Sequence, residues 1–392
     1  MESCIMKRNL IIGLFALTFL ARPLFCQEET TDRPVYQFTI EKELKHTPVR
    51  DQARSSTCWC FAALSLMEAE LLRAGRGEFD LSEMFVVRHT YPMKAENYIR
   101  MHGNANFGGG GYYHDVLEVM KTHGLVPESV YTGMNIEESR HNHGELHSVI
   151  RGMLDGILKR RGSRLTPRWQ EAVSAVLDVY MGAPPISFEF EKTRYTPKSF
   201  LKDRLQLDPD DYIEITSYSH HPFYQTCRLA LPDNWMCYDQ FYNVPLEDFS
   251  NIIETSLQKG YTVVWGGDVS NDDFSTRQTG YGIVPLKDRE EMTAEERKAK
   301  ITEPVIEKKI TQAIRQKAYD SFSTTDDHAM HLVGLATDQL GNRFYLTKNS
   351  HSTDRKFDGY VYLSRPYVLL HGIAIMVNKA ALPKTIKKQL GL

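Results

Sequence analysis

Few cysteines, little net charge and no long apolar run beyond the first 26 residues characterise this 392-residue sequence. Six cysteines are too few for a disulfide-stabilised scaffold, so a buried core must stabilise the fold. The formal net charge of −3 gives no global reason to expect a nucleic acid or an anionic membrane as partner. The sequence also has no second apolar run long enough to span a bilayer, and no internal repeats.

The remaining composition is that of a globular protein with a sizeable core. Hydrophobic residues make up 42% and charged residues 25%, and there are 20 Tyr and 18 Phe. Apolar spacing of three and four predicts helices over 58–74, 112–123, 145–181 and 246–259. Short apolar runs predict strands over 261–265, 330–336, 343–348, 360–363 and 373–377. Helices in the first half and strands in the second indicate an α+β fold.

The first 26 residues have the pattern of a secretory signal peptide. Lys7 and Arg8 precede an apolar run over 10–21, and the chain becomes polar at Gln27. The run is short for a membrane span, and an uncleaved N-terminal anchor is the alternative. The pattern predicts a secreted or periplasmic protein whose mature N-terminus lies near Gln27, with no membrane span after the leader is removed.

Four of the six cysteines follow this leader. Lipid attachment at Cys26, inside the leader, is not expected because a bulky residue precedes it. Cys58 and Cys60 are too close in sequence to pair easily, and Cys60 is expected to face the core. The pairing of Cys227 with Cys237 is left open.

Cys58 lies where a predicted helix begins, in the segment Thr57-Cys58-Trp59. Unpaired N–H groups and the macrodipole at a helix start favour an anion and lower the pKa of a thiol. Six positions earlier, Gln52 carries an amide that is expected to join the Cys58 backbone N–H in holding a developing oxyanion. A lone cysteine at a helix start is most often a packing residue, so the prediction depends on other segments.

Two later segments supply a base and a group that orients it. His328 enters one predicted strand, and Asn349 follows the next strand 21 positions later. Neighbouring antiparallel strands bring such residues side by side. The Asn349 carbonyl then accepts a hydrogen bond from one imidazole nitrogen, which leaves the other nitrogen to face the thiol. The set predicts amide hydrolysis through a thioester, with no cofactor and no metal.

The segments that carry this chemistry resemble those of papain-like cysteine peptidases in order and role. They are Gln52, Cys58-Trp59, Asp327-His328-Ala329 and Asn349-Ser350. About 270 positions separate the cysteine from the histidine, about twice the spacing of a simple papain-like domain. In this the chain resembles the bleomycin hydrolase and aminopeptidase C branch. Other segments that resemble this branch are His328-Ala-Met330, Trp265-Gly-Gly-Asp268-Val269, Tyr195-Thr-Pro197 and Gly110-Gly111.

The resemblance implies a papain-like two-lobed fold within one domain over 27–392, after a signal peptide at 1–26. A helical lobe with insertions, over about 50–285, carries the nucleophile, and an antiparallel β lobe, over about 320–380, carries the histidine and asparagine. The resemblance implies an aminopeptidase that acts on peptide substrates, needs no nucleic acid and assembles as a homo-hexamer. An endopeptidase with an open cleft and a non-catalytic binding protein on the same fold are the alternatives.

The chain departs from the family pattern at three places. Ser56-Thr57 stands where the family usually has a glycine, and His351 stands where a tryptophan usually shields the His–Asn hydrogen bond. In the family, a C-terminal arm enters the cleft and its carboxylate receives the substrate amine. Residues 384–392 do not copy that arm, and are expected to form a surface helix or to fold back with the Leu392 carboxylate near Cys58.

Two weaker patterns are assigned to structure. Gly108–Gly111 lacks the Lys-Ser/Thr of a phosphate loop and is expected to form a turn, or to bring the backbone close to a substrate. His141, His143 and His147 have a spacing that suits a metal ion, but no second cluster accompanies them. A surface helix end is therefore the interpretation of these histidines.

Overall fold

The computed structural model describes residues 36–160, 164–276, 278–287, 291–298 and 301–392. The predicted signal peptide at 1–26 lies outside the described residues. Among the described residues, no helix combines the length and the apolar character that crossing a membrane requires.

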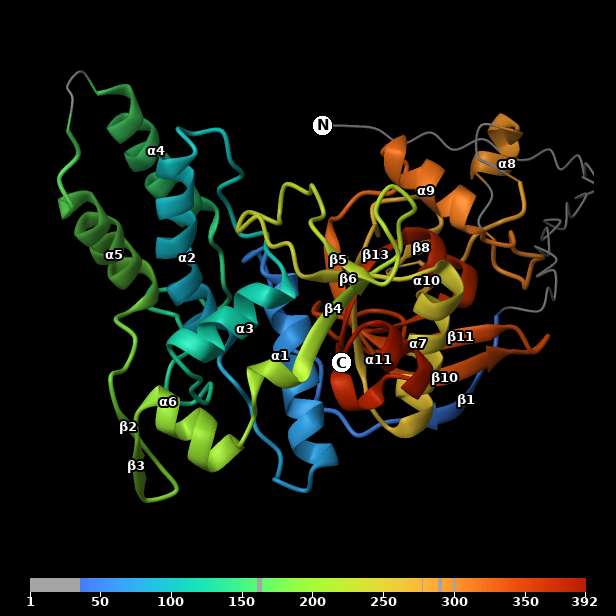
Figure 1. Cartoon of the computed structure of the whole chain (residues 1–392), viewed down its shortest axis with the longest axis horizontal. Coiled ribbons are helices and arrows are strands. Elements are labelled where there is room, and N and C mark those ends of the chain that lie inside the picture. The colour runs from blue at the N-terminus through green and yellow to red at the C-terminus, as the bar shows by residue number, and fades with distance from the viewer. Residues whose placement is uncertain (1–35, 161–163, 277, 288–290, 299–300) are drawn as a thin grey trace, which may run out of the picture.

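Helices dominate the first part of the chain, on the left of Figure 1. They are α1 (Cys58–Arg73), α2 (Glu83–Arg100), α3 (Tyr113–Thr122), α4 (Gly144–Lys159), α5 (Arg168–Met181) and the short α6 (Pro197–Ser199), which continues into a π-helix (Phe200–Leu205). The α1 segment is rich in Ala, Leu, Met and Glu, which are strong helix formers. It is buried on almost every side, whereas α4 and α5 each bury one apolar stripe against α2.

One large mixed sheet forms the other part of the molecule. Its strands lie in the order β5-β6-β4-β13-β7-β10-β11-β12-β9-β8, with β1 paired to β10. Their bounds are β1 Phe38–Glu43, β4 Tyr212–Thr216, β5 Gln225–Cys227, β6 Phe241–Asn243, β7 Val263–Gly267, β8 Phe274–Ser275, β9 Tyr281–Gly282, β10 His328–Asp338, β11 Arg343–Lys348, β12 Tyr360–Ser364 and β13 Gly372–Asn378. A separate hairpin pairs β2 (Phe188–Phe190) with β3 (Thr193–Tyr195).

The central strands of the sheet are buried on both faces. Along β7, Val264 belongs to the core around α1, while its neighbours Val263 and Trp265 belong to the core on the opposite face. The same alternation follows β13, because successive side chains of a strand point to opposite faces. Helix α1 covers the first face, and α7 (Leu246–Lys259) covers the second. This packing places the start of α1 beside the ends of β7 and β10.

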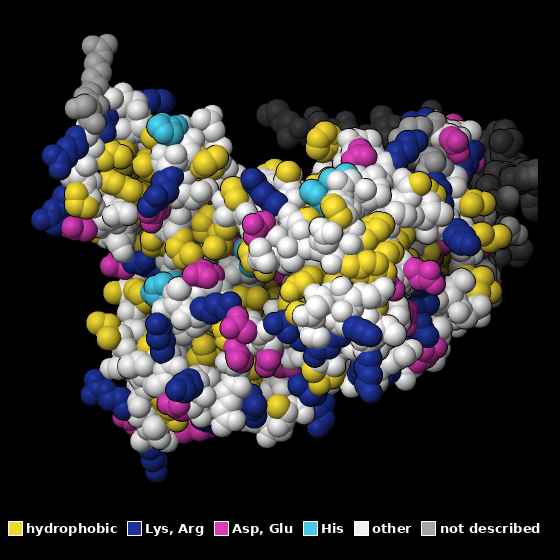
Figure 2. Space-filling view, in the orientation of Figure 1, with side chains coloured by type: hydrophobic (Ala, Val, Ile, Leu, Met, Phe, Trp, Pro, Cys, Tyr) yellow, Lys and Arg dark blue, Asp and Glu magenta, His cyan; other side chains and the backbone are white. Residues whose placement is uncertain are grey.

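The remaining helices surround the sheet. They are α8 (Ala294–Lys298), α9 (Gln312–Asp320), α10 (Arg365–His371) and α11 (Lys384–Gln389). At the start of α8, Thr293 and Glu296 exchange backbone–side chain hydrogen bonds of 2.6 and 3.2 Å, a reciprocal cap. On the face drawn in Figure 2, basic and acidic side chains are interspersed, in keeping with the small net charge.

The strong periodic segments form the elements predicted from the sequence, and α7 and β11 match their predicted bounds. Helix α2 was not predicted, because Pro92 lies inside it and hides its periodicity. Strands β4 and β7 come from the stretch of about 50–285 that was assigned to the helical lobe, yet they pair within the large sheet. The α+β class is confirmed, while the proposed lobe boundaries stay a prediction.

Candidate active site

Cys58 is the first residue of α1, and the turn before it has an unusual backbone. Ala53 and Ser56 adopt positive φ angles of 52° and 58°, a region that non-glycine residues rarely occupy. Such strain persists where the surrounding structure holds it, and it clusters at functional sites. The Gln52 N–H also donates to the Ser350 carbonyl at 2.9 Å. This hydrogen bond links the segment that precedes Cys58 to the residues that follow β11.

His328 and Asn349 lie side by side, as the strand pattern predicted. β10 and β11 are antiparallel neighbours, and the imidazole Nε2 lies 2.7 Å from Asn349 Oδ1. The Ser350 N–H donates to the same oxygen at 2.8 Å, which identifies it as the carbonyl oxygen. Burial lowers the pKa of His328, although the Asn349 hydrogen bond opposes this. A neutral imidazole with its proton on Nε2 leaves Nδ1 able to accept a proton.

The thiol of Cys58 does not have the lowered pKa expected at a helix start. Burial raises the pKa of Cys58 to about 12, against the opposing effect of a hydrogen bond from the Ala329 backbone. The carboxylate of Asp233 is the next cause that raises it, and Asp326 adds to this. The expectation of a lowered pKa was wrong, because neither burial nor these carboxylates could be inferred from the residues around the cysteine.

His351 occupies a place beside the imidazole. Its ring is parallel to that of His328, with centroids 5.1 Å apart and an interplanar angle of 3°. An aromatic ring stacked in this way limits the directions from which water reaches the His328–Asn349 bond. The residue that replaces the family's tryptophan therefore still covers the imidazole.

Cys58, His328 and His351 line one cleft with a volume of about 550 Å³. Among the residues that form its walls are Gln52, Cys58, Gly108–Gly111, Tyr112, Tyr113, Asp233, Gly266, Gly267, Asp326, Asp327, His328 and His351. A Cβ atom at Gly266 would collide with the Tyr113 hydroxyl, and one at Gly267 would lie 2.7 Å from the Trp265 ring. Glycine is required at both positions because β7 passes so close to its neighbours.

Residues 384–392 do not enter this cleft. Ile386 and Leu390 are buried in the core formed with α7, and Leu392 packs against the same core. No residue of this segment is among those that line the cleft in the described part of the chain. The fold-back arrangement is therefore wrong and the surface helix is correct. Figure 1 shows α11 beside α7, and Ile386 and Leu390 are buried in the core that includes α7.

Other residues singled out from the sequence have structural positions. Asp268 accepts hydrogen bonds from the backbone and hydroxyl of Thr325 at 2.7 and 3.0 Å, which fixes the loop before His328. Cys60 is fully buried, and all four described cysteines, including Cys227 and Cys237, are free thiols. No cluster of His, Cys, Asp or Glu suited to a metal ion occurs among the described residues.

Two acidic residues of the cleft, Asp233 and Asp326, were not predicted from the sequence. Asp326 lies two residues before His328, so its position near the histidine could have been read from the sequence. Asp233 lies in an irregular segment between β5 and β6, and no pattern around it indicates that it reaches the cleft.

The fold is that of papain-like cysteine peptidases. The chain belongs to the Peptidase C1-like family, whose model matches residues 95–391. This match begins after Cys58, so the place of the cysteine in the site depends on the geometry described above. As a member of this family the protein acts on peptides.

Relatives are recognisable along most of the chain. It is 22% identical over 387 residues to "Cysteine proteinase 1, mitochondrial" from Saccharomyces cerevisiae, covering 87% of this chain and 76% of that protein. It is 23% identical over 393 residues to "Aminopeptidase C" from Lactobacillus delbrueckii, covering 89% and 83%. The crystal structure of PepW from Lactobacillus rhamnosis has the same fold, with a TM-score of 0.70 at 19% identity over 90% of this chain and 84% of that one. The homo-hexamer stays a prediction.

Proposed function

We propose that this peptidase removes residues from the N-terminus of peptides, by amide hydrolysis through a thioester at Cys58. The observation that carries the chemistry is the His328–Asn349 hydrogen bond of 2.7 Å at the wall of the cleft that Cys58 also lines. The relatives named aminopeptidase C favour release from the N-terminus over internal cleavage.

Each group has one role in this mechanism. His328 Nδ1 takes the thiol proton as Cys58 Sγ attacks the peptide carbonyl carbon, and the imidazolium then gives that proton to the leaving amine. Water attacks the resulting thioester with His328 again as base, which releases the carboxylic acid and restores the thiol. The Cys58 backbone N–H and the Gln52 amide hold the oxyanion in both steps. In support of this, Gln52 lines the same cleft as Cys58.

The orienting role of Asn349 leads to a graded prediction. Asn349→Ala removes the acceptor for His328 Nε2–H, so the ring loses its fixed tautomer but keeps its basic nitrogen. We expect kcat/KM to fall by about 10- to 100-fold. Asn349→Asp retains an acceptor and should lose less. Equal activity of Asn349→Ala and the parent protein would contradict the orienting role of Asn349.

Release from the N-terminus is tested by two matched peptides, one with a free amine and one with an acetylated amine. The proposal predicts one-residue products from the free-amine peptide and slow cleavage of the blocked one, measured by mass spectrometry. Rapid internal cleavage of both peptides would favour the endopeptidase alternative.

We also propose export, on the strength of Lys7, Arg8 and the apolar run over 10–21. Protein made in its native host is expected to begin near Gln27, as read by N-terminal sequencing. An intact Met1 in a soluble cytoplasmic fraction would contradict this.

A further inference from the structure

We propose that Asp233 and Asp326 form the site that receives the α-ammonium group of the peptide substrate. In this arrangement two side-chain carboxylates in the cleft select the free N-terminus. The proposal deepens the function proposed above and depends on it.

Asp233 is held at the cleft from the helical side. Asn106 donates to its Oδ1 at 2.7 Å, and the Asp233 carboxylate lies directly against Gly110. The preceding residue of the same loop is Gly109, whose carbonyl accepts a hydrogen bond from the Trp59 ring nitrogen at 2.8 Å. Trp59 follows Cys58 in α1, so one short loop connects the position of Asp233 to that of the thiol.

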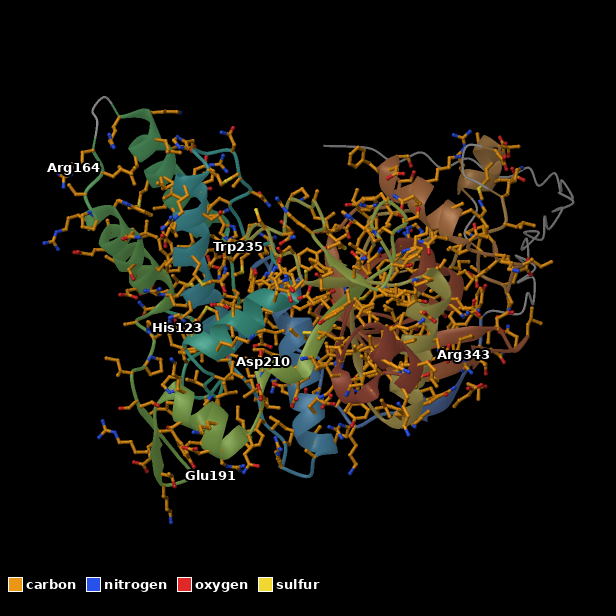
Figure 3. The ribbon with its side chains drawn as sticks, viewed as in Figure 1. His123, Arg164, Glu191, Asp210, Trp235 and Arg343 are labelled. Atoms are coloured by element: carbon orange, nitrogen blue, oxygen red, sulfur yellow. The ribbon has the colours of Figure 1, made fainter. Side chains whose placement is uncertain are left out.

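The segment that carries Asp233 is anchored to two helices. Figure 3 shows Trp235 beside α2, at the border between the helices and the sheet. Asn97 of α2 donates to the Trp235 carbonyl at 2.9 Å, and the Trp235 ring nitrogen donates to buried Asp115 of α3 at 2.7 Å. Two direct bonds therefore fix the chain two residues after Asp233.

Asp326 approaches from the side of the sheet. It precedes the strand that begins at His328, and the Tyr112 hydroxyl donates to its Oδ2 at 2.8 Å. Tyr112 directly follows the glycine loop that Asp233 touches. The two carboxylates thus line the same cleft and are joined through one segment, 108–112.

Three acceptors in this region lack partners. Asp233 Oδ2 and Asp326 Oδ1 accept no hydrogen bond from the described residues, and neither carboxylate has an ion-pair partner within 4.0 Å there. The Tyr113 hydroxyl is also without a partner, and this side chain is 1% exposed and lines the cleft. Leaving a buried hydroxyl unpaired costs about 1–3 kcal/mol. An ammonium group has three N–H donors, one for each of these oxygens.

A cation would stabilise the ionised form of Asp326. Burial, and after it the nearby Asp233 carboxylate, raise the pKa of Asp326 to about 8, so this group is mostly protonated near pH 7 until a cation binds beside it. Lys94 partly offsets the effect of burial on the pKa of Asp233. The Lys94 ammonium, however, donates to the carbonyls of Gly108 and Gly110 and so holds the glycine loop in place. A bound cation would offset the repulsion between the two carboxylates.

The position also suits the α-ammonium of a substrate cut at its first bond. One carbon atom separates that ammonium from the carbonyl that the thiol attacks, so its acceptors must lie close to Cys58. Both carboxylates are close enough to raise the pKa of Cys58. A lysine side chain further along a longer peptide carries the same ammonium chemistry, and the experiment separates the two sources.

The test compares the parent protein with Asp233→Asn, Asp326→Asn and the double variant. Asp239→Asn, an exposed residue of the same segment outside the cleft, is the matched control. Three peptides are used: one with a free amine, the same peptide acetylated, and an acetylated peptide containing lysine. We expect the double variant to lose about 100-fold in kcat/KM on the free-amine peptide, mainly through KM, and less than about threefold on the acetylated one. Iodoacetamide should still label one equivalent of Cys58.

Two results would overturn the proposal. One is an equal loss, or no loss, on free-amine and acetylated peptides. The other is a selective loss on the acetylated lysine peptide, which would show that the two aspartates bind a lysine side chain and not the α-ammonium group. Binding of the free-amine peptide to Cys58→Ala, with and without both asparagines, gives a readout that needs no turnover, with near-UV circular dichroism as the folding check. If the parent protein cuts only internal bonds, the aminopeptidase function fails independently of the aspartate variants.

Discussion

Replacement of Cys58 by alanine is expected to lower peptide hydrolysis by about 10⁴-fold or more, because no thioester can then form. The side chain lies at the start of α1 in the cleft, and the alanine removes one sulfur atom without changing the helix. The measurement is kcat/KM on a free-amine peptide, with thermal unfolding to show that the variant is folded.

Cys237→Ala is the matched control for this variant. Cys237 is an exposed free thiol and does not line the cleft, so its loss should leave the rate within about twofold of the parent value. Parent-level hydrolysis by pure Cys58→Ala would contradict the nucleophilic role of Cys58. A large loss of activity in Cys237→Ala would indicate that Cys237 takes part in the reaction.

The second large effect is expected for His328→Ala, which should lower kcat/KM by about 10³-fold. The pKa of Cys58 is raised to about 12, so almost none of the thiol is ionised at neutral pH without a base at its side. Since a thiol with a raised pKa gains thiolate as pH rises, the residual activity of the variant should increase steadily toward alkaline pH.

The pH profile of the parent protein provides the contrast. His328 has a pKa lowered below its ordinary value, so it is neutral and able to accept a proton at pH 7, and activity should already be high there. His220→Ala is the control, because this exposed histidine does not line the cleft. A parent-like profile in His328→Ala would contradict the role of this base.

The fold was predictable where local pattern and burial agree. The helix at 246–259 and the strand at 343–348 follow from apolar spacing, because α7 and β11 bury the residues that the spacing marks. Helix α2 could not be predicted, since Pro92 breaks its pattern and packing against other helices stabilises it. Short strands such as β4 and β6 have too few residues to show a period, and the sheet stabilises them.

The site was predictable only in part. Cys58, His328 and Asn349 could be proposed from the sequence because each lies at the end of a regular element. The pKa of the thiol could not, because it depends on burial and on Asp233, which reaches the cleft from an irregular segment. The position of residues 384–392 also depends on tertiary packing: Ile386 and Leu390 bury against the core under α7.

A peptide-library digest read by mass spectrometry, with Cys58→Ala as the blank, tests directly whether Cys58 releases residues from the N-termini of peptides. We expect single residues released stepwise from free N-termini in the parent sample and intact peptides in the Cys58→Ala sample. The same products in both samples, or internal fragments without N-terminal release, would contradict it.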